Sequence, residues 1–260
     1  MLLSAAQSHL TLCSKINNKL INKDIDVKKF VLTSTILFSL IFNTVNAEDA
    51  EKAVTANTTS YSARYINGDV KFFYLQADGT FALGKNFGAS LGANNLYIND
   101  DYDSDNVQNI RAAAFYRSPD FGRIELAYQN LFFDGESDSA YSITGEYYFE
   151  NWTLGAYVLS DDLSELNDLN IYSNIYFTDN VRLELDLLDS SDSALLSAKV
   201  NFQAPEYIGN EWQFFLSYGE TFRESEYRWG IGVKYTPDFN DTLKRFYRNY
   251  STNVKSVFFL

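Results

Sequence analysis

The sequence predicts an all-β fold, namely a transmembrane, antiparallel, up-and-down β-barrel of about twelve strands. Many short segments alternate apolar and polar residues, their connections alternate between short and long, and aromatic residues make up 17 % of the chain. The clearest segment is YRWGIGVKY at 227–235, whose odd positions are apolar and whose even positions are basic or glycine. Because successive side chains of a strand point to opposite faces, one face suits lipid and the other suits water.

The composition excludes several classes of function. The chain has 34 acidic and 21 basic residues and a net charge of −13, so nucleic acid is a poor partner. No apolar run after residue 48 reaches the roughly 20 residues that a transmembrane helix needs. The single cysteine, Cys13, and the single histidine, His9, both precede the apolar run described next. If that run is a cleaved signal, the mature protein has no disulfide and no Cys or His ligand, base or nucleophile.

The segment 1–47 is read as an N-terminal extension followed by a secretory signal peptide. Lys28 and Lys29 form a basic region, 30–42 is an apolar core, and Ala47 ends a small-x-Ala cleavage pattern. We therefore expect cleavage after Ala47. An uncleaved membrane anchor is the alternative, and the short apolar core argues against it. A signal normally begins near its basic region, which suggests a translation start near Val27.

After the signal we expect a periplasmic lead-in at 48–68, the outer-membrane barrel at 69–239 and a basic, aromatic tail at 240–260. Twelve alternating segments fall within the barrel, an even number as in single-chain bacterial barrels. The expected strands are 69–76, 80–85, 87–97, 107–117, 123–132, 140–149, 152–160, 168–177, 181–188, 193–203, 211–220 and 226–236.

The connections between these strands form two interleaved sets. The short set comprises 85–86, 118–122, 149–151, 178–180 and the longer 204–210. The other set is mostly longer and acidic, and comprises 98–106, 133–139, 160–168, 189–192 and 220–226. Short periplasmic turns that alternate with longer outer loops are typical of a membrane barrel. An even number of strands then leaves both ends of the barrel domain on the periplasmic side.

Charged residues fall on one face of each clear strand. The segment VRLELDL at 181–187, for example, puts valine and leucines on one face and Arg182, Glu184 and Asp186 on the other. A charge on the lipid face at mid-membrane would cost roughly 2–4 kcal/mol, so the charged face is the inner one. Small residues share it, including Gly230, Gly232 and one of Gly145 and Gly155. The expected pore-lining residues are Arg111, Arg123, Glu125, Glu146, Arg182, Glu184, Asp186, Lys199, Arg228 and Lys234.

Two segments carry a family resemblance. FALGKNFGASLGA at 81–93 contains a strand–turn–strand of the form LG-x-x-FG, and RAAAFYRSPDFGRIELAY at 111–128 contains an aromatic-Arg-x-Pro-x-x-Gly turn. Over about 69–236 the chain resembles a mostly uncharacterised group of porin-like outer-membrane proteins of Gram-negative bacteria. Its motifs mark turns, so the resemblance implies an outer-membrane barrel and says nothing about a substrate.

The end of the chain departs from that pattern. Barrel proteins of this kind commonly finish on the last strand with a terminal aromatic residue, whereas here about twenty residues follow the segment 226–236. This tail carries Lys244, Arg245, Arg248 and Lys255 in an otherwise acidic protein. We read it as a periplasmic extension. A frame error, or a closing strand at 256–260, are the alternatives.

The acidic loop at 100–105 is the one candidate for a metal site. Asp101, Asp103 and Asp105 recur at alternate positions, as at the opening of a calcium loop, but the glycine and the closing glutamate of such a loop are replaced by Asn106 and Ala112. We therefore interpret it as a solvated outer loop near lipopolysaccharide, and expect no bound metal. The sequence gives no indication of another cofactor.

The interpretation that best accounts for these features is a porin-like channel for passive diffusion of small polar solutes or ions. Its expected partners are outer-membrane lipid, lipopolysaccharide and the barrel-assembly machinery, with the oligomeric state open. Two alternatives are a structural barrel whose inner charges pair and close the lumen, and a surface-binding protein that acts through its loops. An enzyme is not expected, because outer-membrane phospholipase chemistry needs a histidine and because Glu184 with Asp186 is a poor basis for catalysis.

Overall fold

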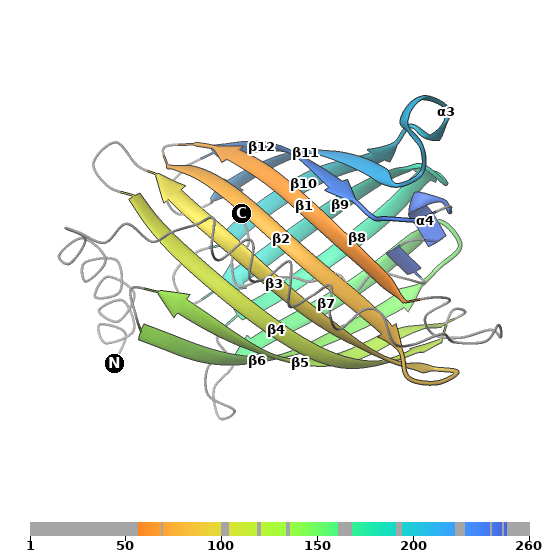
Figure 1. Ribbon diagram of the computed structural model, residues 1–260, viewed down its shortest axis with the longest axis horizontal. Coiled ribbons are helices and arrows are strands. Elements are labelled where there is room, and N and C mark those ends of the chain that lie inside the picture. The colour runs from red at the N-terminus through yellow and green to blue at the C-terminus, as the bar shows by residue number, and fades with distance from the viewer. Residues whose placement is uncertain are drawn as a thin grey trace.

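The computed structural model describes residues 57–68, 70–99, 104–118, 121–133, 136–160, 168–190, 194–221, 227–239, 241–245 and 247–248. Within them the chain forms a closed barrel of antiparallel strands in which every strand pairs with its sequence neighbours (Figure 1). The signal peptide and its cleavage site, residues 48–56 and the possible closing strand at 256–260 lie outside the described residues. No helix in the described part is long and apolar enough to cross a membrane.

The barrel has twelve strands, and its first and last strands close it. Tyr61 of β1 pairs with Tyr235 of β12, and the register continues to Asn67 and Trp229. The predicted fold class, an up-and-down β-barrel of about twelve strands, is therefore confirmed. The strands are β1 (Thr58–Asn67), β2 (Lys71–Ala82), β3 (Phe87–Asn99), β4 (Ser104–Ser118), β5 (Gly122–Phe133), β6 (Glu136–Tyr148), β7 (Trp152–Ser160), β8 (Asp168–Thr178), β9 (Val181–Ser190), β10 (Ala194–Gln203), β11 (Trp212–Thr221) and β12 (Tyr227–Tyr235).

Two boundaries near the start of the barrel differ from the prediction. The expected lead-in at 48–68 contains β1, so the barrel begins at Thr58 rather than at 69. The expected strands 69–76 and 80–85 are one strand, β2, which pairs with β3 over its whole length. Asp78 and Gly79 resemble a turn in sequence. In the structure they pair with Gly92 and Leu91 inside the sheet. The unexpected β1 adds one strand and the joining of two expected strands into β2 removes one, so the strand count is unchanged.

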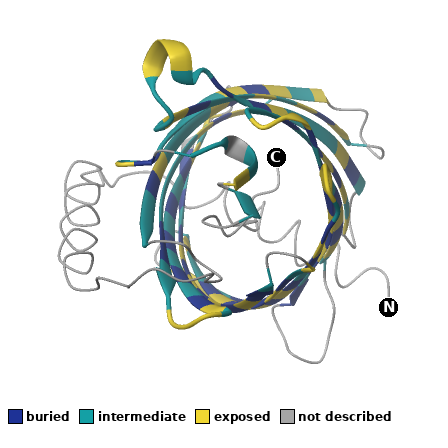
Figure 2. Cartoon of the chain, turned by 90° about the vertical axis from the view of Figure 1, so that its right-hand side faces the viewer, coloured by how far each residue is buried: buried dark blue, intermediate teal, exposed yellow. Residues whose placement is uncertain are grey.

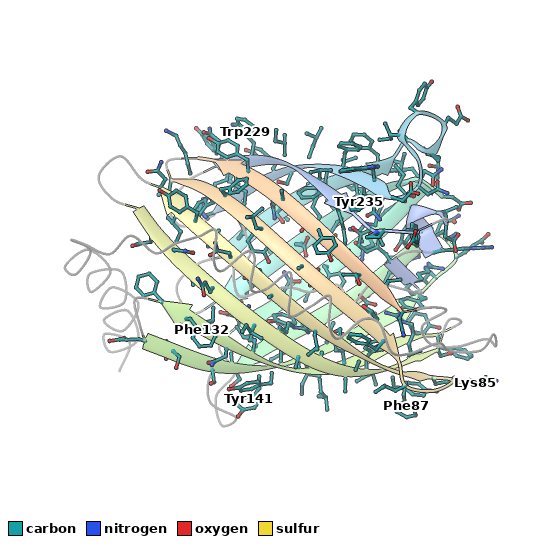
Figure 3. The ribbon with its side chains drawn as sticks, in the orientation of Figure 1. Lys85, Phe87, Phe132, Tyr141, Trp229 and Tyr235 are labelled. Atoms are coloured by element: carbon teal, nitrogen blue, oxygen red, sulfur yellow. The ribbon has the colours of Figure 1, made fainter. Side chains whose placement is uncertain are left out.

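The outer surface of the barrel is apolar and has aromatic residues toward both ends. Trp229, Phe132 and Tyr141 lie toward one end, and Tyr235 and Phe87 lie toward the other (Figure 3). Edge-to-face and tilted ring pairs tie neighbouring strands together at both ends, for example Tyr65 with Trp229 and Phe87 with Tyr116. Aliphatic side chains lie between, exposed on the outside: Leu126, Ile143, Ile171, Leu185, Leu216 and Ile231. This is the surface that a hydrocarbon layer with two interfaces requires.

The two ends of the barrel differ in their connections. At one end, here named the short-turn end, the strands are joined by short turns and by helix α3 (Pro205–Ile208), and helix α4 (Leu243–Arg245) lies there as well (Figure 1). One turn needs a glycine, because Gly122 has a φ of +149° and a Cβ there would lie 2.0 Å from the carbonyl oxygen of Glu146. This explains the glycine that ends the turn motif at 116–122. The opposite end is named the long-loop end.

Candidate functional site in the barrel lumen

The structure places all ten expected pore-lining residues on the inner face of the barrel. Burial alternates along the strands, with inner residues buried or half-buried and outer ones exposed or half-buried (Figure 2). Arg111, Arg123, Glu125 and Arg182 each expose at most 2 % of their surface. Gly155, and not Gly145, faces inward on its strand. That these residues line an open, water-filled path stays a prediction.

One cluster of polar side chains is centred on Glu146 of β6. Its carboxylate accepts hydrogen bonds from the Tyr172 hydroxyl at 2.6 Å, from the Tyr148 hydroxyl at 3.1 Å and from the Arg123 guanidinium at 3.4 Å. The cluster joins β5, β6 and β8 across the inner wall. Because a buried carboxylate is stable only when it is paired and hydrogen-bonded, these partners account for a charge at this depth.

A second carboxylate extends this cluster around the wall. Glu125 of β5 forms an ion pair with Arg111 of β4 and lies 4.0 Å from Arg123. Next to them Arg117 is fully buried, and its guanidinium lies 4.9 Å from the ring centre of Phe115. Positive and negative groups therefore alternate across β4, β5 and β6. The charged inner side chains of these three strands are therefore connected by ion pairs.

A third cluster lies on β9 and β10. Glu184 accepts from Arg182 at 2.7 Å and from Lys199 at 2.8 Å. Arg182 is buried, whereas the Lys199 side chain keeps 24 % of its surface accessible. Asp186 lies two residues farther along the same inner face and is also buried. Two bases and two acids therefore share this part of the inner wall, and Glu184 is paired with both bases.

The charged inner side chains of β1, β2 and β12 are more accessible. Arg64 of β1, Asp78 of β2, and Arg228 and Lys234 of β12 are half-buried rather than buried. Together with Lys199 they put four bases and one acid on this side of the lumen. The accessible part of the inner wall therefore runs along β10, β12, β1 and β2, and it is positively charged.

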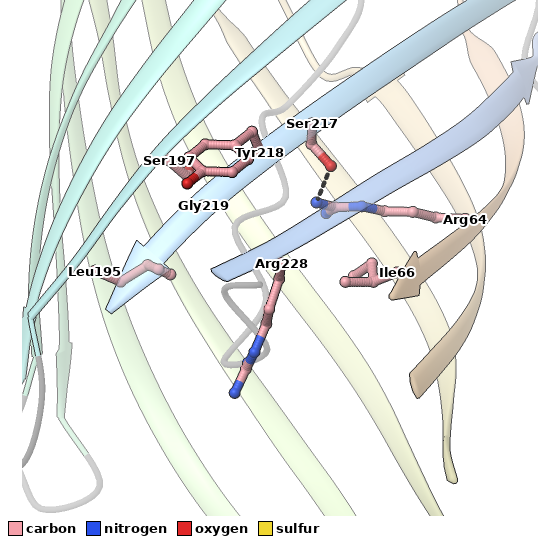
Figure 4. Close-up of a pocket in the computed structure, with 8 residues that line it drawn as sticks. All are labelled: Arg64, Ile66, Leu195, Ser197, Ser217, Tyr218, Gly219 and Arg228. Carbon is pink, nitrogen blue, oxygen red and sulfur yellow. Dashed lines mark hydrogen bonds between the residues drawn. The ribbon is translucent and has the colours of Figure 1, made fainter. Parts of the chain in front are cut away.

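A small pocket on this accessible wall holds two of the bases (Figure 4). Arg64 donates a hydrogen bond to the Ser217 hydroxyl at 3.0 Å. Arg228 lies across the pocket, with its guanidinium 5.2 Å from the ring centre of Phe72. The lining contains no acidic side chain: it is Arg64, Ile66, Leu195, Ser197, Ser217, Tyr218, Gly219 and Arg228.

Three inner aromatic rings lie along the wall because each is paired with a glycine. In three places a glycine is directly opposite an aromatic residue on the next strand, and a Cβ on the glycine would lie 2.2–2.3 Å from the ring. Only a residue without a side chain lets the ring lie flat there. The space of the lumen is therefore not taken up by these rings. The pairs are Gly88 with Phe115, Gly155 with Tyr172, and Gly232 with Phe215.

We expect Gly155→Ala to destabilise the barrel. The new methyl group would lie 2.2 Å from the Tyr172 ring, so the ring must turn away and its hydroxyl must leave Glu146. Overpacking of this kind costs about 1–3 kcal/mol. The matched control is Gly145→Ala, where nothing lies within 4 Å of the new Cβ. Denaturant unfolding of the refolded proteins measures both, and equal effects would contradict the proposed packing role of Gly155.

The tail after β12 reaches the inside of the barrel wall, which the sequence did not predict. The Tyr247 ring centre lies 3.3 Å from the Arg182 guanidinium, and the Arg248 guanidinium contacts the turn between β6 and β7. Burial raises the pKa of the Tyr247 phenol, although the Arg182 charge acts to lower it, so the ring is uncharged at neutral pH. The described part of residues 240–260 turns back onto the barrel. That this tail is a periplasmic extension stays a prediction.

Some inner residues were not predicted from the sequence, for two different reasons. Arg64 and Asp78 were missed because β1 was taken as lead-in and β2 was divided at Asp78. The alternation of serines and Arg64 with Tyr61, Ala63 and Tyr65 was the available signal. Tyr247 and Arg248 have no periodic neighbours, and their role appears only through contacts made in the folded chain.

The acidic-loop candidate for a metal site is not tested by the structure. Asp105 is buried on β4, whereas Asp101 and Asp103 lie outside the described residues. Among the described residues, no group of three or more His, Cys, Asp or Glu side chains is placed to hold a metal ion.

A closed antiparallel barrel with an apolar outside and a charged inside defines a porin-like β-barrel fold. No family model matches the chain, and no curated protein sequence matches it. Among solved structures, the KdgM porin in complex with disordered oligogalacturonate aligns with a TM-score of 0.54 at 13 % identity, over 68 % of this chain and 98 % of that one. The NanC porin aligns with a TM-score of 0.50 at 10 % identity, over 68 % and 98 %. The resemblance to porin-like barrels is thus confirmed at the level of the fold.

Proposed function

We propose that this protein is an outer-membrane channel for passive diffusion of small polar solutes. The proposal rests on the contrast in polarity between the outer and inner faces of one closed sheet. The outside is apolar with aromatic residues toward both ends, and the inside carries bases, acids, amides and hydroxyls. A wall of this kind separates lipid from a polar interior. The porin folds with which it aligns support the same reading.

The solutes that suit the accessible wall are anions or polar molecules with an anionic group. Arg64, Lys199, Arg228 and Lys234 face this path, and Asp78 is the half-buried acid on the described parts of β1, β2, β10 and β12. The buried acids Glu125, Glu146 and Glu184 are engaged with arginine and lysine partners. Rings or rows of basic side chains favour anions in a pore. One solved porin of the same fold holds oligogalacturonate, an anionic sugar oligomer, so short acidic sugars are a solute class to test.

Planar-bilayer recording of the refolded full chain tests the channel. We expect small, stable conductance steps and, under a potassium chloride gradient, a reversal potential that shows preference for chloride. Lys234→Gln should reduce that preference because it removes a base from the accessible wall. Lys85→Gln, which removes the same charge from an exposed turn, should leave it unchanged. Silent membranes with well-folded protein would end the channel proposal.

The alternative of a closed structural barrel has one observation in its favour. The charged side chains in the middle of β4, β5, β6 and β9 are almost fully buried and pair with one another. These side chains are paired along the wall, and the path that we propose therefore runs along the accessible wall. The closed barrel predicts no conductance and unchanged solute uptake in a deletion strain, and the same recordings therefore distinguish the two.

The cellular setting that we propose follows from the channel. The outer surface suits outer-membrane lipid and, on the outer leaflet, lipopolysaccharide, and insertion would use the barrel-assembly machinery. Secretion would depend on the signal at 1–47, with cleavage after Ala47. Mass spectrometry of the mature N-terminus tests the cleavage site. The chain is proposed to act by passage of solutes rather than as an enzyme.

A further inference from the structure

We propose that residues 241–245 and 247–248, here named the C-terminal strap, form a built-in constriction across the short-turn end of the barrel. The strap is held by a site in the opposite wall that binds the guanidinium of Arg248. The proposal extends the proposed function, since it gives the strap a role in limiting passage through the lumen. It rests on where the strap begins, where it is fastened and what fastens it.

The strap crosses from one side of the barrel to the other. It follows β12, and its last described residue contacts the turn between β6 and β7. In the closed ring of twelve strands, β12 and β6 are six places apart and therefore face each other. The view into the short-turn end shows α4 over the opening (Figure 2). The turn that sends the chain inward contains Asp238, whose φ of 55° is in the left-handed region.

The first half of the strap is fastened to the rim. The backbone N–H of Lys244 donates to the carbonyl of Asp179 in the turn between β8 and β9, at 3.0 Å. The Lys244 ammonium donates to the Asn151 side chain in the turn between β6 and β7, at 3.1 Å. Two adjacent turns thus hold the strap, and the one between β6 and β7 lies opposite the strand from which the strap comes.

The second half is fastened by Arg248. Its guanidinium donates to the backbone carbonyls of Phe149 and Trp152, the latter at 3.1 Å. It also lies between two rings, 5.3 Å from the centre of Tyr148 and 5.4 Å from that of Tyr176. Converging carbonyls and aromatic faces suit a planar cation with several donors, which is why arginine and not lysine fits here. This is a built site with one occupant, and the occupant comes from the same chain.

Tyr247 fills the space between the two anchors. Its ring centre lies 3.3 Å from the Arg182 guanidinium of β9 and 5.8 Å from the Lys234 ammonium of β12. Both bases belong to the inner wall, and Lys234 belongs to its accessible part. The ring therefore stands at the end of the path that we propose for solutes. An uncharged aromatic ring there narrows the path next to the Lys234 charge.

The strap can leave without breaking the sheet. The barrel is closed by β1 and β12 alone, and the strap adds no strand to it. Its fastening consists of side-chain and rim contacts, which are individually weak and reversible. Release would therefore widen the short-turn end while the ladder hydrogen bonds of the barrel stay intact. The strap is thus suited to act as a reversible constriction.

A cysteine pair tests where the strap lies, independently of conduction. Asp179→Cys with Lys244→Cys places two thiols on residues joined by a backbone hydrogen bond. In the full-length refolded protein we expect a disulfide between them under mild oxidation, detected by peptide mass. Absence of the disulfide in protein that still shows heat-modifiable migration would overturn the proposal.

Bilayer recording then tests what the strap does. Arg248→Ala should raise the single-channel conductance several-fold, whereas Lys85→Ala, at an exposed turn outside the strap, should leave it unchanged. With the disulfide closed, the channel formed by the double-cysteine variant should stay at the low conductance. Reduction of the disulfide should restore fluctuations of the conductance. A conducting channel with equal conductance in all these proteins would overturn the constriction. A disulfide that forms in proteins that are all silent would refute the channel and the constriction, and would confirm only the position of the strap.

Discussion

Glu146→Ala is expected to lower the free energy of unfolding by about 3–5 kcal/mol, because it removes one partner of a buried charge cluster. Arg123 of β5, Tyr172 of β8 and Tyr148 of the same strand all donate to this carboxylate. Its loss leaves a buried guanidinium with fewer compensating acceptors and two hydroxyls to be satisfied elsewhere. Glu146→Gln keeps an acceptor oxygen and should give a smaller loss.

The measurement is denaturant unfolding of refolded protein in lipid, followed by tryptophan fluorescence. The matched control is Glu136→Ala, an exposed position on the same strand, which should change the free energy of unfolding by no more than about 0.5 kcal/mol. If the two variants unfold at the same denaturant concentration, the cluster does not contribute to stability as proposed.

Leu185→Arg is expected to cost about 2–4 kcal/mol in folding, because it puts a charge on the lipid-facing side of β9. Leu185 lies near the middle of the strand and is exposed on the outside, between Ser173 and Ala198 of the neighbouring strands. A guanidinium there would have to leave water for hydrocarbon. Reduced yield of the heat-modifiable, folded form on a gel measures the effect.

Asp186→Asn is the control for Leu185→Arg, because it removes a charge from the next residue, which faces inward. We expect near-normal folding of this variant. Comparable defects in both variants would mean that the lipid-facing side of β9 has been assigned wrongly.

Alternation along the strands was enough to predict much of the fold. It gave the inner face of each clear strand and all ten expected inner charged residues, because a period of two leaves only two possible faces. The number of strands agrees only because the missed β1 and the divided β2 cancel. It could not separate Gly145 from Gly155, since glycine has no side chain to show the period. The register, in which Gly155 lies under Tyr172, settled that point.

The parts that were missed depend on contacts rather than on pattern. Serines and threonines weaken the alternation of β1, and its strand character becomes clear only in its pairing with β12. The strap has no period, because its position is fixed by single contacts such as Arg248 on two main-chain carbonyls. Every residue type has a backbone carbonyl, so the sequence does not indicate which carbonyls at a turn will bind an arginine.

The seam between β1 and β12 has a consequence for the order of assembly. Every other pairing joins consecutive strands, so it can form locally as a hairpin, whereas this one brings Tyr61 to Tyr235. Pairings between distant residues form slowly, and until this one forms the chain has two open edges that can template aggregation. Ring closure is therefore expected to be the last step. Substitutions at the seam should slow folding and trap an open sheet, even where they leave the finished barrel as stable as before.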